Sequence, residues 1–219
     1  MHEFLIRKAR LDDAAFLADA IIAAEKSGTD KLGLATLFDL TESEVRSAIC
    51  AMLEEEIDEC EFSISSFLIA EHNGDNVAAV GGWVEGFNQK IASRILKANL
   101  ISFCIPRENI LSAHSKSASL AGVAIERENL SLQIEYVYVD KTQRGKSLTE
   151  SLINQHIANA LLAYPQLKKI QVQVFSNNIP AIKAYEKCGF KIAGTFKSDN
   201  NDILQSLPHN EKYLMDINL

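Results

Sequence analysis

Two stretches of this chain combine residue types suited to anion binding and proton transfer. The first is the polar turn 140–147, where Arg144 and Lys146 flank Gly145 between an alternating apolar run and a run with helical spacing. A helix that starts at such a turn leaves its first N–H groups without internal partners, and its dipole favours negative charge. A basic turn alone is often simply solvated. Together, the strand, turn and helix predict a cradle for a diphosphate.

The second stretch is residues 174–190. Pro180 is tolerated only in the first turn of a helix, which predicts a short helix at 181–188 closed by Gly189. Tyr185 lies within this helix. Glu135 stands apart from both stretches as a charged residue in the apolar strand 134–139. A carboxylate there must meet water at a cleft or have a partner.

Composition narrows the class of protein. The chain has 219 residues, of which 47% are hydrophobic and 23% charged, and its formal net charge is −7. Such a charge disfavours nucleic-acid binding and could steer a cationic substrate. No apolar run is long enough for a membrane span, and no signal peptide is recognisable, so we expect a cytoplasmic protein. The four cysteines form no Cys-x-x-Cys pair, which favours reduced, buried thiols and no metal site.

Alternating strands and helices must position these residues. Strands are expected at 4–9, 67–71, 77–84, 120–126, 130–139, 169–175, 190–196 and 212–219, with a hairpin turn at Asn73-Gly74. Helices are expected from Asp12 or Asp13, from a capping box at Thr41 and Glu44, and after residues 90, 146 and 180. Residues 32–40 and 114–117 are expected to be loops. The pattern predicts one α/β domain over 1–219.

These stretches resemble the GNAT superfamily of acyl-CoA-dependent N-acyltransferases. Residues 178–190 match its Asn-x-x-Ala-x-x-x-Tyr-Glu-Lys-x-Gly-Phe pattern, and Arg144 opens its Arg-x-x-Gly-x-Gly/Ala motif. That motif is only partly kept, because Ser147 and Thr149 stand where glycine, and glycine or alanine, are usual. The segment 85–129 is an insertion compared with the shorter family connection. It could form a lid, a packing element or a homodimer contact, and we favour the structural role.

The resemblance implies a mixed, mostly antiparallel sheet with helices on both faces. Two central strands, 134–139 and 169–175, would splay apart to admit acetyl-CoA as the cosubstrate. The expected coenzyme-binding residues are Val137, Tyr138, Val139, Arg144, Gly145, Lys146, Ser147, Leu148, Thr149, Asn178 and Tyr185. Because Ser and Thr are small and a helical φ does not demand glycine, we expect weakened rather than lost coenzyme binding.

The resemblance also implies direct acyl transfer without a covalent enzyme intermediate. A backbone N–H at 137–139 would polarise the carbonyl, and Tyr185 would protonate the leaving thiolate. Glu135 would accept the proton of the amine, directly or through water. Each residue also has a structural alternative: Tyr185 as a packed aromatic, Glu135 as part of an ion pair, and Asn178 as a helix cap.

The leading hypothesis is an N-acetyltransferase that acts on a primary amine, either of a small molecule or of a protein. The net charge favours a cationic small molecule slightly. The alternative is a non-catalytic acyl-CoA-binding or assembly module of the same fold, suggested by Ser147, Thr149 and the long segment 85–129. A longer acyl chain is a third interpretation. Neither nucleic acid nor a membrane is an expected partner.

Overall fold

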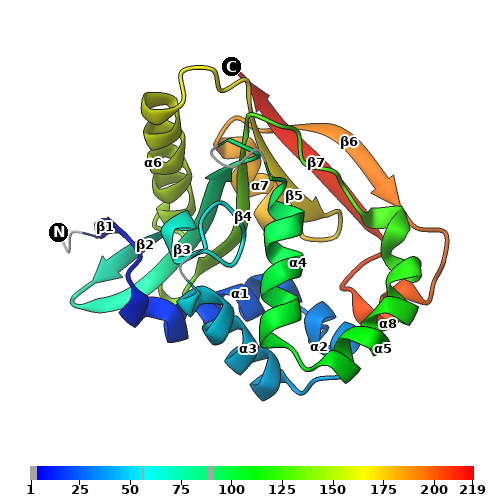
Figure 1. The fold of residues 1–219 in the computed structure, drawn as a ribbon. Helices are drawn as coiled ribbons and strands as arrows, with labels where there is room; N and C mark the ends of the chain where they lie inside the picture. Colours follow the sequence, from blue (N-terminus) through cyan, green and yellow to red (C-terminus); the bar gives the residue numbers. More distant parts are fainter. Residues whose placement is uncertain (1–3, 56, 88–90) are drawn as a thin grey trace.

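The computed structural model describes residues 4–55, 57–87 and 91–219. Seven strands form one sheet in the order β1-β2-β3-β4-β5-β7-β6 (Figure 1). The strands are β1 (Leu5–Lys8), β2 (Phe67–His72), β3 (Asp75–Val84), β4 (Ser131–Val139), β5 (Lys169–Phe175), β6 (Lys191–Lys197) and β7 (Glu211–Asn218). Neighbouring strands are antiparallel, except that β4 and β5 are parallel.

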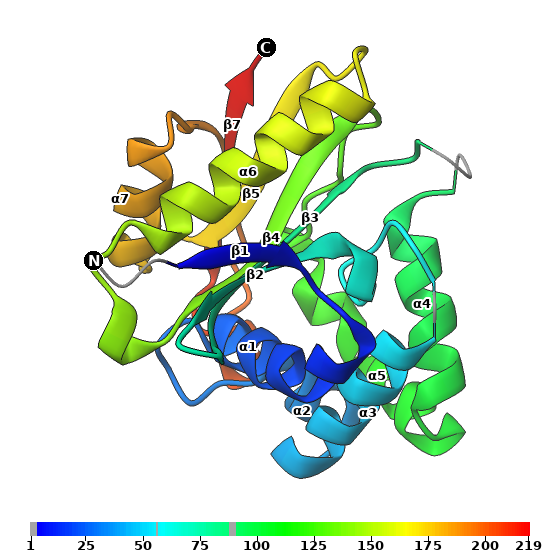
Figure 2. The ribbon, with the colours of Figure 1, turned by 90° about the vertical axis from the view of Figure 1, so that its left-hand side faces the viewer.

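Helices cover both faces of the sheet, and each face has its own hydrophobic core (Figure 2). On one face lie α1 (Ala14–Lys26), α2 (Gly33–Phe38), α3 (Glu42–Glu54), α4 (Ser93–Cys104) and α5 (Arg107–Ser117). On the other lie α6 (Leu148–Ala163) and α7 (Ile179–Lys187). A short helix, α8 (Ile203–Ser206), contacts α2. The mixed, mostly antiparallel sheet with helices on both faces is confirmed.

The two central strands separate part-way along their length. The pairing of β4 with β5 runs from Ser131 opposite Lys169 to Ile134 opposite Val172 and stops there, although both strands continue. Beyond that point β5 is paired with β7 alone. The expected split between two parallel strands is therefore present, and it opens at the end of β4 that leads into α6.

Local sequence signals account for several of these elements. Thr41 accepts a hydrogen bond from the backbone N–H of Glu44, and the Glu44 carboxylate accepts from the N–H of Thr41, so the capping box of α3 is confirmed. The β2–β3 hairpin turns at Asn73 and Gly74, whose φ angles are 53° and 89°. Two positive φ angles in a two-residue loop suit the twist of the flanking strands.

Three expectations from the sequence are wrong. Residues 32–40 contain the helix α2, residues 114–117 end the helix α5, and residues 120–126 form a helical turn followed by irregular chain rather than a strand. The helices α2 and α5 pack on one another, and Asn109 donates a hydrogen bond to the carbonyl of Phe38. These two helices depend on a tertiary contact that local periodicity does not encode.

Within the described ranges, no helix has both the length and the apolar character that crossing a membrane requires.

Candidate active site

A cavity of about 1020 Å³ lies where β4 and β5 separate. Its walls come from β4, β5, the turn before α6, the helix α7, the end of α1, the start of α4 and the first residues of β7. Ten of the eleven residues expected to bind the coenzyme line it: Val137, Tyr138, Val139, Arg144, Gly145, Ser147, Leu148, Thr149, Asn178 and Tyr185. Lys146 is the exception. Glu135 also lies in the wall.

The strand β4 carries a bulge at the mouth of the split. Tyr136 has a φ of 53°, and the register of β3 with β4 shifts so that Val80 has no partner on β4. Because β5 pairs with β4 only as far as Ile134, it does not use the backbone polar groups of residues 137–139. An unused strand edge in a cavity can hydrogen-bond an extended ligand, and its N–H groups can stabilise a developing oxyanion.

The turn before α6 has the shape of an anion site. Gly145 has a φ of 79°, and the helical hydrogen bonds begin with the N–H of Ser151 donating to Ser147. The first-turn N–H groups of α6 are therefore free of helical partners. The Arg144 guanidinium donates to the Val139 carbonyl, while Lys146 donates to Gln143. Backbone donors, a helix dipole and Arg144 together fit a diphosphate.

Ser147 corrects one expectation about this turn. It is the N-cap of α6 and has a φ of 57° and a ψ of 21°, in the left-handed region. The argument that a helical φ does not demand glycine is therefore wrong at Ser147, because glycine adopts this conformation without the steric cost of a side chain. It holds at Thr149, which lies within α6.

Tyr185 lies at the other wall of the cavity. Its side chain is buried against Phe190, with 6.0 Å between the ring centroids. Burial, followed by the charges of Cys188 and Glu135, raises the pKa of the phenol well above its usual range, so the group keeps its proton at neutral pH. Asn178 caps α7 by accepting from the N–H of Ala181, and its amide donates to Ser27 at 2.7 Å.

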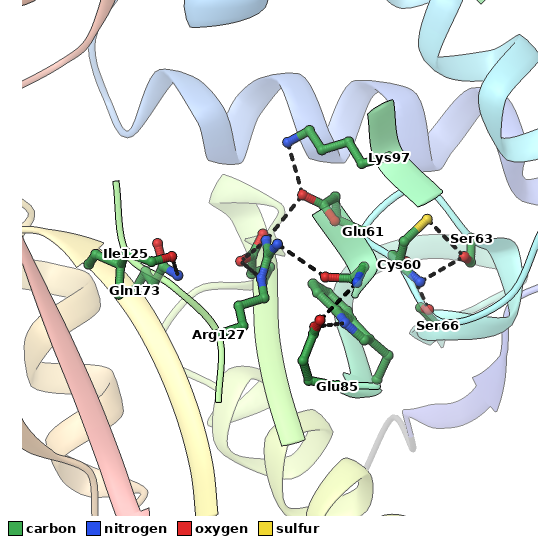
Figure 3. A network of polar contacts seen from close by, with 12 residues as sticks. Cys60, Glu61, Ser63, Ser66, Glu85, Lys97, Ile125, Arg127 and Gln173 are labelled. Atoms are coloured by element: carbon green, nitrogen blue, oxygen red, sulfur yellow. Dashed lines mark hydrogen bonds and ion pairs between the residues drawn. The ribbon is translucent and has the colours of Figure 1, made fainter. Parts of the chain in front are cut away.

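Glu135 is part of a network of charges between β4 and the helix α4. Figure 3 labels the other three members, Glu61, Lys97 and Arg127. Its Oε1 accepts hydrogen bonds from Arg127 at 2.6 Å and 3.2 Å. Arg127 also donates to Glu61 at 3.1 Å, and Lys97 approaches the same Glu61 oxygen at 2.9 Å. Lys97 and Arg127 hold the pKa of the buried Glu61 carboxyl at about 2, although burial alone would raise it. Glu135 therefore has the partner that an apolar strand requires.

The comparisons with known proteins agree with this geometry. Residues 34–190, more than half of the chain, match the model of the acetyltransferase (GNAT) family. The chain belongs to this family. A stretch of 61 residues, which is 28% of this chain, is 39% identical to streptothricin acetyltransferase from Escherichia coli. The match spans only about a third (34%) of that relative.

Solved structures share the GNAT fold over nearly the whole chain. An N-acetyltransferase from Staphylococcus aureus Mu50 superimposes with a TM-score of 0.66 at 17% identity, covering 97% of this chain and all of the other. An aminoglycoside acetyltransferase in complex with coenzyme A gives a TM-score of 0.52 at 17% identity, covering 99% and 95%. These identities are low, so the likeness concerns the fold.

Several charged residues of the cavity wall in this GNAT protein were not foreseen from the sequence, and Glu25 and Lys212 are two of them. Glu25, at the end of α1, and Lys212, at the start of β7, both line the cavity. A signal for Glu25 was present, because it stands four residues after Ile21 and eight after Leu17, on the buried face of the helix. Lys212 has no comparable signal, since an isolated lysine in an alternating strand usually faces water.

Proposed function

We propose that this GNAT protein transfers the acetyl group of acetyl-CoA to a primary amine by direct attack, without a covalent enzyme intermediate. The observation that carries the proposal is the split between β4 and β5, which exposes a strand edge to a cavity that Tyr185 also lines. Acetyl-CoA would supply the thioester. The protein would hold it at the turn before α6 and along residues 137–139, and would keep the amine nearby.

Each proposed role follows from the chemistry of the residue. Backbone N–H groups at residues 137–139 would donate to the carbonyl oxygen as negative charge develops on it. A bond forms from the amine nitrogen to the acetyl carbon, and the bond from that carbon to sulfur breaks. Tyr185 would give its proton to the leaving thiolate, and its protonated state at neutral pH supports this role. Proximity supplies much of the remaining rate.

The amine must also lose a proton. Glu135 would accept it, directly or through water, and the proton would return through solvent to Tyr185. The ion pair with Arg127 limits this role, because a proton on Glu135 would neutralise one half of a part-buried pair. We therefore propose Glu135 as base through a water molecule at the oxygen that Arg127 leaves unused.

Cysteine nucleophiles are not needed in this proposal. Burial raises the pKa of the thiols of Cys50, Cys60 and Cys104, and raises that of Cys188 to about 11. A raised thiol pKa leaves little thiolate at neutral pH, and the thiolate is the nucleophilic form. This supports direct transfer over an acyl-cysteine route.

The test is acetyl-CoA turnover over a panel of amines, measured by release of the free thiol. Tyr185→Phe removes one oxygen and keeps the ring, so we expect kcat to fall by about 10²-fold or more, the scale of lost general-acid catalysis. Coenzyme affinity, measured by calorimetry, should stay near that of the unchanged protein.

Tyr164→Phe is the matched control, because Tyr164 packs against Phe87 and is not among the residues that line the cavity. It should leave kcat unchanged. Tight coenzyme binding without turnover of any amine would contradict the proposed reaction and favour the alternative, a non-catalytic acyl-CoA-binding or assembly module. Equal rates for Tyr185→Phe and the unchanged protein would remove Tyr185 as the acid.

A further inference from the structure

Near Lys97 and Glu135, the cavity holds two charges that stand outside the ion pairs. Glu25 and Lys212 are both half-buried in its wall, and in the part of the chain that the structure describes neither forms an ion pair. Charges withdrawn from water without a partner are costly. Their presence beside an open cavity calls for a ligand that offers the missing partners.

Glu25 enters the cavity from the last turn of α1. Burial raises the pKa of its carboxyl, and the charges of Lys97 and Lys212, with a hydrogen bond from the backbone N–H of Leu34, oppose that rise. A Cβ atom on Gly33 would lie 3.7 Å from one carboxylate oxygen of Glu25. The α1–α2 connection therefore folds around this carboxylate while leaving it on the cavity wall.

Lys212 enters the cavity from β7, where this strand pairs with β5. Its ammonium nitrogen lies 4.8 Å from the centroid of the Phe175 ring, the residue that faces it across the two strands. Burial lowers the pKa of this lysine, and the charges of Glu135 and Glu25 counteract the effect. The aromatic ring holds the ammonium group in place but does not neutralise it.

The buried charges that surround Glu25 and Lys212 compensate one another. Lys97 and Arg127 are cations, Glu61 and Glu135 are anions, and the four are joined by contacts of 2.6–3.1 Å (Figure 3). Arg94 also lines the cavity, but its side chain is exposed to solvent. In this part of the wall, what remains for a ligand is one carboxylate, Glu25, and one ammonium group, Lys212. Glu150, a further half-buried carboxylate of the wall, belongs to the first turn of α6.

We propose that the acceptor carries a carboxylate as well as the reacting amine, and that Lys212 binds this carboxylate while Glu25 binds the ammonium form of the amine on arrival. This inference rests on the proposed acetyl transfer and names the class of its substrate. A polycation without acidic groups would satisfy Glu25 and place like charge against Lys212, which is unfavourable. The net charge of −7 over the whole chain, which favours a cationic acceptor, therefore does not predict the charges of this acceptor.

Pairs of acceptors that differ only in the carboxylate test this inference. Suitable pairs are lysine with 1,5-diaminopentane, and phenylalanine with 2-phenylethylamine, each assayed for kcat/KM by thiol release. We expect the unchanged protein to use at least one amino acid and to lose about 10- to 100-fold on it in Lys212→Gln, the scale of one hydrogen bond to a charged group. The amine without a carboxylate should not lose activity in this variant.

Comparing one variant across both members of a pair removes the effect of their different amine basicities. Lys212→Arg keeps the charge and should keep most of the preference. Glu25→Gln should lower kcat/KM for both members of a pair by similar factors, because both carry the amine. Lys197→Gln is the matched control, since Lys197 is an exposed lysine of the neighbouring strand β6 and is not among the cavity-lining residues.

The outcomes separate the two proposals. Turnover of amines with the same loss on both members of a pair in Lys212→Gln, or with no loss, overturns the carboxylate-bearing acceptor and leaves acetyl transfer standing. Turnover of polycationic amines alone does the same. Absence of turnover of every amine overturns the acetyl transfer itself, and this inference with it.

Discussion

Ser147 shows how a single residue can be under strain where a family motif usually has glycine. A residue with a side chain in the left-handed region costs about 1–2 kcal/mol relative to the ordinary helical region. Ser147 adopts that region at the N-cap of α6, and it makes no side-chain capping hydrogen bond in return. This conformation lies where the chain enters α6, whose first residues line the cavity.

Glycine substitution at Ser147 and at Thr149 should therefore have opposite effects. Ser147→Gly relieves the strain, but the larger conformational entropy of glycine in the unfolded chain offsets part of this gain. The free energy of unfolding should therefore rise by up to about 1 kcal/mol. Thr149→Gly places glycine inside a helix and should lower it by about 0.5–1 kcal/mol. Urea unfolding of the two variants measures both, and a loss of stability in Ser147→Gly would contradict the strain.

At the scale of elements, α6 is tied to the sheet through a buried histidine. His156 Nε2 donates to the carbonyl of Val80, 2.8 Å away, in the strand β3. Val80 is the residue opposite the β4 bulge. A Cβ atom on the nearby Gly82 would lie 2.7 Å from the imidazole, so only glycine leaves room for the ring. This contact fixes α6 against the strands that form the cavity.

Burial lowers the pKa of His156 to about 4, against about 6.5 when unfolded. Between these values the unfolded chain binds more protons than the folded one. The resulting stability is fully present above pH 6.5 and is lost as the pH falls through that window, by about 3 kcal/mol at pH 4. Replacing His156 by glutamine should remove this part of the pH dependence.

The measurement is the free energy of unfolding at pH 7 and at pH 4.5 for both proteins. His114→Gln serves as control, because His114 is exposed on α5 and should leave the pH profile unchanged. An equal decline in His156→Gln and the unchanged protein would mean that other groups cause the acid sensitivity.

At the scale of the molecule, one sheet separates two hydrophobic cores. Ile49 of α3 is fully buried in one core, and Ile153 of α6 is fully buried in the other. Both cores include side chains of the same strands, β2 and β3. In β2, Ile69 packs in one core and Leu68 packs in the other. We propose that the chain 1–219 unfolds as one cooperative domain because neither core is closed without the shared sheet.

Ile49→Ala and Ile153→Ala should each lower the free energy of the same unfolding transition by about 2–5 kcal/mol. Acetyl-CoA at 100 times its dissociation constant should restore about 2.7 kcal/mol in both variants. Urea titrations followed by near- and far-ultraviolet circular dichroism check this. A second transition, or protection of one variant only, would contradict a single domain.

Sequence reasoning was most successful where a local signal determines the structure. The capping box at Thr41, the Asn73-Gly74 turn and the motif around Tyr185 predicted their elements directly. The prediction that β4 separates from β5 came from the family resemblance. No residue type within 131–139 indicates that the pairing of these strands stops at Ile134.

The charged part of the cavity wall was beyond such reasoning. Arg127 and Glu61 are 66 positions apart, and their ion pair, with the one that joins Lys97 to Glu61, exists only because α4 lies against the sheet. A carboxylate in an apolar stretch, such as Glu61 between Cys60 and Phe62, indicates that a charged partner is needed, but the sequence does not identify that partner. Charge pairing across the fold is a tertiary property.

The split sheet also leaves an unpaired strand edge inside the sheet rather than at its border. An unpaired strand edge normally invites a strand from another chain, and exposed edges are common starting points for aggregation. Here the free edge of β4 lies in the interior of the sheet, between a paired neighbour on each side. Helices cover both faces of that sheet. A strand of another chain therefore reaches this edge less easily than the outer edges of β1 and β6.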